Sequence, residues 1–362
     1  MLARIVVITT GLLALAPASS SAGVVSAISG PTLCDRGCSA TVAVTYAPAA
    51  GERLDAVFTT DADGALVVFD PGGVRAVEGC SSTGATSARC ARTDPRVDSP
   101  HAALSARGGE GDDRLVASSK LFRPKLTGGA GNDVLIGGGD LDGGPGDDDL
   151  DGLGRVLAIL DGGPGADRLR GGAVSYSDRR AAVRFDASRP GSPAGEAGEG
   201  DTVGPDVSGL FGGSGDDILT ARDRRYGGFG GDLSGGDGDD VLVGGSGTDL
   251  LQGGTGSDRL EGGPGPDQIT GGGTSKDRDI VLGGSGKDSL DLRGSRVVAR
   301  GGAGSDYVWA PGAGDLVYLR GGGRDRVDCG GGPAGGPTAT LMLDRRDVAS
   351  SRCRGVRRSS DR

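Results

Sequence analysis

The stretch "GGDGDDVLVGGSGTDLLQGGTGSDRLEGGPGPDQIT", residues 235–270, repeats one nine-residue phrase four times without an insertion. Each copy reads Gly-Gly-x-Gly-x-Asp-x-aliphatic-x. Three glycines in six residues permit left-handed and crowded backbone conformations at little steric cost. The three residues that follow suffice for a short strand whose middle side chain lies on one face. One turn and one strand make half a coil, so 18 residues predict a full coil with a turn at each edge.

The hexapeptide Gly-Gly-x-Gly-x-Asp occurs twelve times in the chain, beginning at residues 108, 128, 143, 162, 212, 227, 235, 244, 253, 262, 283 and 301. Eleven copies carry Leu, Ile or Val at position eight, whereas the copy at 227 is one residue short. Residues 271–282 and 292–300 resemble decayed copies. A fixed aliphatic register predicts stacked coils around a thin apolar interior, because no unit can bury its side chain alone. We therefore predict an all-β fold, a parallel β-roll or solenoid with a small N-terminal β module.

Position six of every copy is aspartate. In stacked coils, units n and n+2 share an edge, so their carboxylates face one another at strand spacing and repel. The predicted facing pairs are Asp240 with Asp258, Asp249 with Asp267, and Asp288 with Asp306. A divalent cation between successive turns reverses the sign of this interaction. Calcium fits best, because it accepts six to eight carboxylate and carbonyl oxygens in forgiving geometry, whereas magnesium requires a tighter octahedron.

These nonapeptides resemble the repeats-in-toxin (RTX), or haemolysin-type, calcium-binding repeats, whose family fold is a calcium-filled parallel β-roll. The resemblance covers residues 108 to about 328 and implies multiple Ca²⁺ ions, bound by the position-six carboxylates together with turn carbonyls. The metal ligands that it implies are Asp113, Asp133, Asp148, Asp167, Asp217, Asp232, Asp240, Asp249, Asp258, Asp267, Asp288 and Asp306. The segment "DRVDCGGG" (325–332) also resembles endings of exported actinobacterial members of the group.

The N-terminal 22 residues, "MLARIVVITTGLLALAPASSSA", have the composition of a secretory signal. Arg4 supplies the positive region, an apolar run follows, and Ser20-x-Ala22 fits cleavage after small residues. The run is too short to span a membrane comfortably, and no later stretch approaches about 20 apolar residues. We predict a secreted, extracellular protein without a membrane span; an uncleaved anchor is the alternative interpretation.

The remainder of the chain is predicted to contain three further parts. Residues 23–101 contain β-branched runs broken by turns and predict a disulfide-stapled β module. Residues 102–328 form the roll, interrupted at 171–211, where 174–177 and 182–185 alternate like strands and 187–206 has the composition of a surface loop. Residues 329–362 form a C-terminal cap and basic tail. The predicted disulfides are Cys34–Cys38, Cys80–Cys90 and Cys329–Cys353, because the competing zinc site lacks a C-x₂-C pair and His101 is near no pair.

Composition restricts the function. The chain has 75 glycines among 362 residues, only 3% aromatics and a net charge of −10, which excludes a large conventional core and argues against a nucleic-acid partner. We predict a non-enzymatic calcium-binding roll that folds as calcium binds. The alternatives are an adhesin or matrix interaction protein with a polysaccharide ligand, and a polysaccharide-modifying enzyme on a roll scaffold. The chain contains no G-x-S-x-G or H-E-x-x-H motif, which disfavours the enzyme.

Two predictions concern outward side chains. The position-five acids Asp112, Asp216 and Asp239 are expected to face solvent and to affect calcium affinity at most. Tyr307 and Trp309 are expected to point outward, because Val308 between them points inward. We expect these two aromatic rings to pack against the C-terminal cap.

Overall fold

The computed structural model describes residues 23–29, 42–47, 54–60, 66–69, 74–76, 80–82, 87–90, 105–118, 123–155, 157–189, 193–221, 231–274, 276–294, 296–309, 314–329, 339–353 and 355–358. The predicted signal peptide, the predicted Cys34–Cys38 disulfide and His101 lie outside these residues. Every element of secondary structure within these residues is a β-strand, which confirms the all-β prediction. The chain divides into two compact units, residues 1–173 with 201–207, and residues 174–200 with 208–362.

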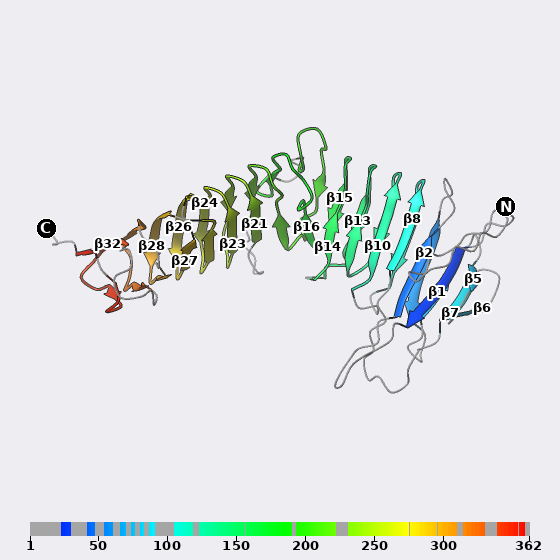
Figure 1. The fold of residues 1–362 in the computed structure, drawn as a ribbon, viewed down its shortest axis with the longest axis horizontal. Coiled ribbons are helices and arrows are strands. Elements are labelled where there is room, and N and C mark those ends of the chain that lie inside the picture. The colour runs from blue at the N-terminus through cyan, green and yellow to red at the C-terminus, as the bar shows by residue number, and fades with distance from the viewer. Residues whose placement is uncertain are drawn as a thin grey trace, which may run out of the picture. The chain divides into compact units, whose positions relative to one another are not determined.

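In the first unit the chain passes alternately between two sheets, in which the strands of the coils pair in parallel (Figure 1). One sheet has the order β8 (Ser105–Glu110), β10 (Lys125–Ala130), β12 (Asp140–Asp142) and β14 (Ile159–Asp161). The other has the order β18 (Thr202–Val203), β15 (Arg168–Arg170), β13 (Asp149–Asp151), β11 (Val134–Ile136), β9 (Arg114–Ala117), β3 (Asp55–Thr60), β4 (Leu66–Phe69), β7 (Ser87–Cys90) and β6 (Cys80–Ser82). Each coil contributes one strand to each sheet, as the nonapeptide period predicts.

The N-terminal segment does not form a sheet entirely of its own. Strands β2 (Val42–Ala47), β1 (Gly23–Ser29) and β5 (Val74–Ala76) make a three-stranded sheet, but β3 pairs in parallel with β9. Ala56 lies opposite Leu115 in this pair, and both are fully buried. The predicted β module therefore supplies the strand on which the first coil stacks. The backbones of Cys80 and Cys90 are directly opposite one another in the antiparallel pair β6–β7.

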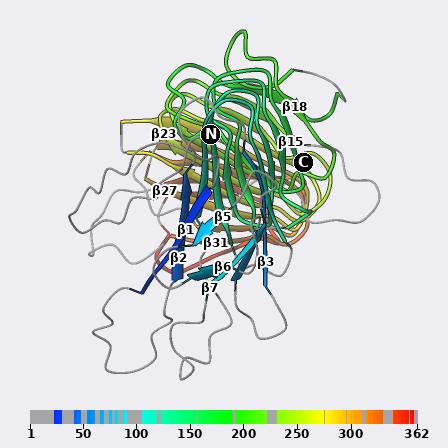
Figure 2. The same cartoon turned by 90° about the vertical axis from the view of Figure 1, so that its right-hand side faces the viewer.

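The second unit repeats the two-sheet arrangement, with its coils seen end-on in Figure 2. One sheet has the order β19 (Gly209–Phe211), β21 (Asp232–Asp237), β23 (Leu250–Thr255), β25 (Gln268–Gly272), β27 (Ser289–Gly294), β29 (Tyr307–Trp309), β31 (Arg326–Asp328) and β33 (Val348–Ala349). The other has the order β17 (Arg184–Asp186), β20 (Ile218–Thr220), β22 (Val241–Val243), β24 (Arg259–Pro264), β26 (Arg278–Gly286), β28 (Arg296–Gly304), β30 (Leu316–Leu319), β32 (Thr340–Leu343) and β34 (Val356–Arg358). The predicted parallel β-roll is confirmed.

The interruption at 171–211 contributes strands to both units. Its predicted strands correspond to β16 (Ala173–Ser175), which contains the boundary between the units, and to β17 in the second unit. The predicted loop 187–206 is shorter than expected, because Asp201 is fully buried and β18 begins directly after it in the first unit. The interruption therefore completes coils rather than leaving the roll entirely.

The aliphatic residues at position eight form the interior. Leu115, Leu135, Leu150, Leu169, Leu219, Leu242, Leu251, Leu260, Ile269, Leu290 and Val308 are each at most 1% exposed. The two decayed copies keep the register through Val281 and Ala299, which are fully buried. Burial of such a side chain contributes about 1.5–3 kcal/mol, so each coil adds stability only when its neighbours cover it.

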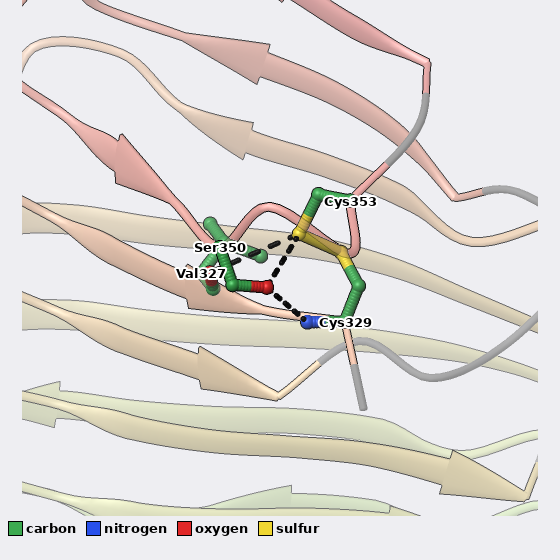
Figure 3. Close-up of a disulfide and its surroundings, with 4 residues drawn as sticks. All are labelled: Val327, Cys329, Ser350 and Cys353. Carbon is green, nitrogen blue, oxygen red and sulfur yellow. Dashed lines mark hydrogen bonds between the residues drawn. A yellow bond between two sulfur atoms is a disulfide. The ribbon is translucent and has the colours of Figure 1, made fainter. Parts of the chain in front are cut away.

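A disulfide fastens the C-terminal coils. Cys329 follows β31, and its sulfur is bonded to that of Cys353 with a Cα–Cα distance of 5.1 Å (Figure 3). The Cys329 N–H donates to the hydroxyl of Ser350. This confirms the predicted Cys329–Cys353 pair. Closing a loop of this length contributes about 3 kcal/mol by restricting the unfolded chain.

Candidate metal centre

The glycines of the hexapeptide make room in two directions. Gly254 and Gly256, at positions two and four, have φ values of 123° and 127°, where L side chains are strained. A Cβ added to Gly254 would also overlap the carbonyl oxygen of Gly236 in the preceding coil. At position one, a Cβ added to Gly253 would overlap Oδ2 of Asp258 in its own hexapeptide. Two glycines thus allow the turns to stack, and the third leaves space for the aspartate.

The position-six carboxylates connect successive coils. Oδ1 of Asp258 accepts the backbone N–H of Asp240, 18 residues earlier, at 3.0 Å. The other two predicted pairs repeat the contact, Asp249 N–H to Asp267 Oδ1 at 2.9 Å and Asp288 N–H to Asp306 Oδ1 at 3.1 Å. All three facing pairs predicted from the period are confirmed.

These contacts join into three rows. Row 1, in the first unit, contains Leu54, Asp113, Asp133, Asp148, Asp167 and Asp201. Row 2, in the second unit, contains Val183, Asp217, Asp240, Asp258, Asp279, Val297 and Asp315. Row 3, on the other edge of the second unit, contains Gly231, Asp249, Asp267, Asp288, Asp306, Asp325 and Asp347.

Among the described residues, the first unit has no carboxylate row at its second edge. Asp140 and Ile159 donate their N–H groups to the carbonyls of Pro124 and Gly139, just as Val134 does to the carbonyl of Asp113 in row 1. Pro124 and Gly139 therefore occupy the positions that aspartate holds in row 1. Each coil of the first unit carries one candidate ligand, whereas most coils of the second unit carry two.

Eleven of the twelve predicted ligands lie in these rows and are at most 2% exposed. Asp232 lies outside them, because its copy is one residue short. Leu233 keeps the inward register opposite Leu251, which places Asp232 at the outward position opposite Leu250 and Gly231 in row 3. Burial of the leucine thus fixes the local register.

Sequence reasoning missed five row members, Asp201, Asp279, Asp315, Asp325 and Asp347. None belongs to a complete hexapeptide. Four of them directly precede a strand, and Asp279 is the second residue of β26. Each begins the pattern Asp-x-Val or Asp-x-Ala, so the half of the nonapeptide that enters the strand was the signal that could have found them. The rows consequently extend to residue 347.

The second carboxylate oxygen of eight row aspartates is buried without a hydrogen bond among the described residues. Oδ2 has no hydrogen bond among the described residues in Asp133, Asp148, Asp240, Asp258, Asp267, Asp288, Asp306 and Asp325. An isolated buried carboxylate is costly unless it is neutralised or paired. Beside Gly253, for example, a Cβ would meet both Oδ2 of Asp258 and the carbonyl oxygen of Gly271 in the next coil, so the space holds oxygen atoms of both kinds.

Burial dominates the electrostatics of the rows. It raises the pKa of Asp148 to about 8, although the N–H of Asp133 opposes the shift and neighbouring aspartates add to it. The same causes raise the pKa of Asp240 and Asp267 to about 7, and of Asp258, Asp288 and Asp325 to about 6. Without a cation, these six aspartates therefore keep their protons to a higher pH than an exposed aspartate, because burial raises their pKa.

The donor set fits calcium. Within the described residues, no three His, Cys, Asp or Glu side chains converge on one point, so each site must combine row carboxylates with turn carbonyls. Such an all-oxygen set suits a hard cation of adaptable geometry. Row carboxylates, with backbone carbonyls from the adjoining turns, are the groups that would hold it.

Position five forms a separate, exposed row. Asp112, Asp216 and Asp239 face solvent, as predicted. Oδ1 of Asp239 also accepts the N–H of Ser257 in the following coil at 2.7 Å, and Asp112 accepts the N–H of Asn132 in the same way. These bonds run opposite to those of the buried rows, so the position-five side chains also contribute to stacking.

The family model of the RTX calcium-binding nonapeptide repeat (four copies) matches residues 125–142, 159–173, 210–223, 226–259, 234–269 and 252–290. The chain carries RTX-type calcium-binding nonapeptide repeats. The matched RTX segments contain candidate ligands from all three rows, whereas the RTX match ends before Asp306, Asp315, Asp325 and Asp347. No curated protein matches the sequence.

Proposed function

We propose that this chain is an exported, non-catalytic structural protein whose roll folds as calcium binds to the three rows. The observation that carries the proposal is the set of buried, unpartnered Oδ2 oxygens at regular intervals along stacked coils. The RTX match supports calcium as the cation. The ligands that we propose are the eleven predicted row members and the five that the pattern search missed.

The stacking contacts explain why binding and folding are coupled. A row carboxylate is fixed through Oδ1 only when the preceding coil presents its N–H, as Asp240 does for Asp258. The position-one glycine then leaves Oδ2 facing the space between turns. Bound calcium supplies the positive charge that offsets carboxylate burial and repulsion. Because the ligand set exists only in stacked coils, binding free energy becomes folding free energy. Extracellular modules of this kind bind calcium at about 10⁻⁴–10⁻³ M.

Calcium stoichiometry tests the proposal. Asp258→Asn removes one row-2 carboxylate, and Asp239→Asn removes a neighbouring exposed one as the matched control. Equilibrium dialysis of the full chain, with metal counted by mass spectrometry, is expected to show fewer bound calcium ions for Asp258→Asn only. Equal stoichiometry in both variants and the unchanged chain would reject row 2 as a calcium site.

Export is supported by the signal-like residues 1–22 and by the Cys329–Cys353 disulfide, which is typical of oxidising compartments. The described residues contain no helix long and apolar enough to cross a membrane. In this proposal 23–101 remains a module that adjoins the roll at 102–328, with 329–362 as its cap. N-terminal sequencing of protein from the culture medium should begin near residue 23. Recovery of the chain only from the cell, with residues 1–22 still attached, would contradict export.

A second candidate function is attachment to a polysaccharide of a cell surface or matrix. The observation that favours it is the charge of the second unit's outer face, described below. A polysaccharide-modifying enzyme is the weaker alternative, because no catalytic motif occurs in the sequence. Turnover of a glycan by the purified chain would overturn the non-catalytic proposal.

A further inference from the structure

The two outer faces of the second unit differ in chemistry. On the face formed by β24 to β32, the outward residues Ile280, Val298 and Leu316 are register partners on adjacent strands and form an aliphatic strip. Ile280 is 40% exposed and Val298 is 39% exposed. Outward residues of the opposite face, on β23 to β27, include Gln252, Thr270 and Ser289. The aliphatic strip therefore belongs to one face only.

Arginines lie on both sides of this strip. Arg278 and Arg296 are register partners on one side, and Arg300 and Arg320 lie on the other. We call these four residues and the strip the arginine face. All four are exposed, and none has a carboxylate partner among the described residues. On the opposite face Arg293 is paired with Asp291, so its charge is already neutralised.

The charge of the chain is distributed unevenly. Residues 293–362 contain 13 arginines and 7 aspartates, although the whole chain has a net charge of −10. Four of those aspartates, Asp306, Asp315, Asp325 and Asp347, are buried in the rows. They contribute little to the surface once they are neutralised, which leaves a strongly basic surface at this end of the second unit.

We infer that the arginine face binds a linear anionic polysaccharide that runs across the strands, along the aliphatic strip. Carbon–hydrogen faces of sugar rings pack on Ile280, Val298 and Leu316, while carboxylate or sulfate groups on either edge pair with the arginines. Arg300 is oriented for this by the ring of Tyr318, 5.6 Å from its guanidinium carbon. Arginine also presents the planar, bidentate donors that such groups require.

The geometry favours a polysaccharide over a lipid bilayer or a nucleic acid. The aliphatic side chains lie in a flat sheet face between longer arginines, so they cannot reach the hydrocarbon region of a bilayer. Nucleic-acid bases stack on aromatic side chains, whereas the middle of the arginine face is an aliphatic strip. A ligand that is both apolar along its middle and anionic at its edges matches the observed pattern.

Binding to dextran sulfate tests the inference, with unsulfated dextran as the uncharged control of the same backbone. The variant Arg296→Ser/Arg300→Ser/Arg320→Ser removes three charges from the arginine face. The matched variant Arg107→Ser/Arg114→Ser/Arg168→Ser removes three charges from the first unit. Calorimetry in saturating calcium should show at least a tenfold weaker Kd for the first variant only. The slope of log K against log salt concentration should become less negative by about two to three, as expected for three lost ion contacts to a polyanion.

The inference rests on the proposed function, a folded and calcium-loaded roll. Different results would reject the proposed function and the arginine face. Absence of calcium binding by the unchanged chain would reject the proposed function. Normal calcium stoichiometry in both triple variants, with equal affinity for dextran sulfate, would reject only the arginine face. Equal loss in both variants would show a nonspecific charge effect and also reject it. Tighter binding to anionic phospholipid vesicles or DNA than to dextran sulfate would overturn the choice of ligand.

Discussion

The first unit stacks its coils with one row of buried aspartates, whereas the second unit has a row at each edge. Both bury the same kind of aliphatic interior, from Leu115 to Leu169 in one and from Leu219 to Val308 in the other. Row contacts in the first unit join residues 20, 15 and 19 positions apart, but five of the second unit's contacts keep a spacing of 18. An edge without the hexapeptide tolerates coils of variable length. The aliphatic register builds the roll, and the carboxylate rows determine how strongly it depends on a cation.

The largest expected effect is one that the two units share. Leu150→Ala in the first unit and Leu242→Ala in the second each remove a fully buried interior side chain. Each should lower the free energy of unfolding in calcium by about 2–5 kcal/mol, because the thin interior cannot close the cavity. Denaturant titration followed by circular dichroism measures the loss.

Leu250→Ala is the matched control, because Leu250 points outward and is 46% exposed. It should change the unfolding free energy by less than about 1 kcal/mol. A loss of stability for only one of the two leucine variants would contradict the claim that both units depend on the same kind of aliphatic interior.

The next largest effect is the pH dependence of stability in the metal-free protein, which should differ between the two units. The raised pKa values mean that the metal-free folded chain binds more protons than the unfolded chain, whose aspartates titrate near 3.8. The stability that this contributes is present below about pH 4 and is lost as pH rises through about 6 to 8. We expect chelator-treated protein to gain β-structure when pH falls from 8 to 5, more in the second unit with its two rows.

Hydrogen exchange of peptides from β22–β27 and β9–β13 at the two pH values, corrected for intrinsic exchange rates, measures this difference. Saturating calcium should remove most of the gain, since the cation replaces the protons. Protection that increases with pH over the same interval, without metal, would contradict the assignment of the row carboxylates as neutral in the metal-free roll.

The smallest effect belongs to the outer surface. Arg170 in β15 contacts Asp149 at 2.9 Å and Asp151 at 3.1 Å on an exposed face. Arg170→Ala should cost at most about 1 kcal/mol, because solvent screens such pairs. A loss as large as that of Leu150→Ala, measured in the same denaturant titration, would show that surface charge rather than interior packing holds the first unit.

The sequence predicted features that depend on a local period. Every position-eight aliphatic is buried, and the facing pairs such as Asp240 and Asp258 follow from two strands per coil. Asp232 was misplaced because a single deletion leaves two possible registers, and only burial of Leu233 decides between them. Asp325 and Asp347 lack the complete Gly-Gly-x-Gly-x-Asp hexapeptide on which the prediction relied.

The period of the repeat does not predict pairing between strands that are distant in sequence. The parallel contact of β3 with β9 joins residues about sixty positions apart in sequence, and no repeat connects them. The arginine face, by contrast, keeps the 18-residue spacing across β26, β28 and β30, as Ile280, Val298 and Leu316 show. Its residues lie at outward positions, which the registers of the inward aliphatic residues and aspartates do not mark. The contact of β3 with β9 follows from tertiary stacking rather than from any local pattern.

The most direct measurement is hydrogen exchange of the full chain during a calcium titration at pH 7.5, with magnesium as the comparison. We expect the amides of row residues and of the strands beside them to become protected with calcium and not with magnesium. The second unit should gain more protection than the first. Full protection of both units in chelator at this pH, unchanged by calcium, would contradict the claim that the rows are calcium sites on which the roll depends.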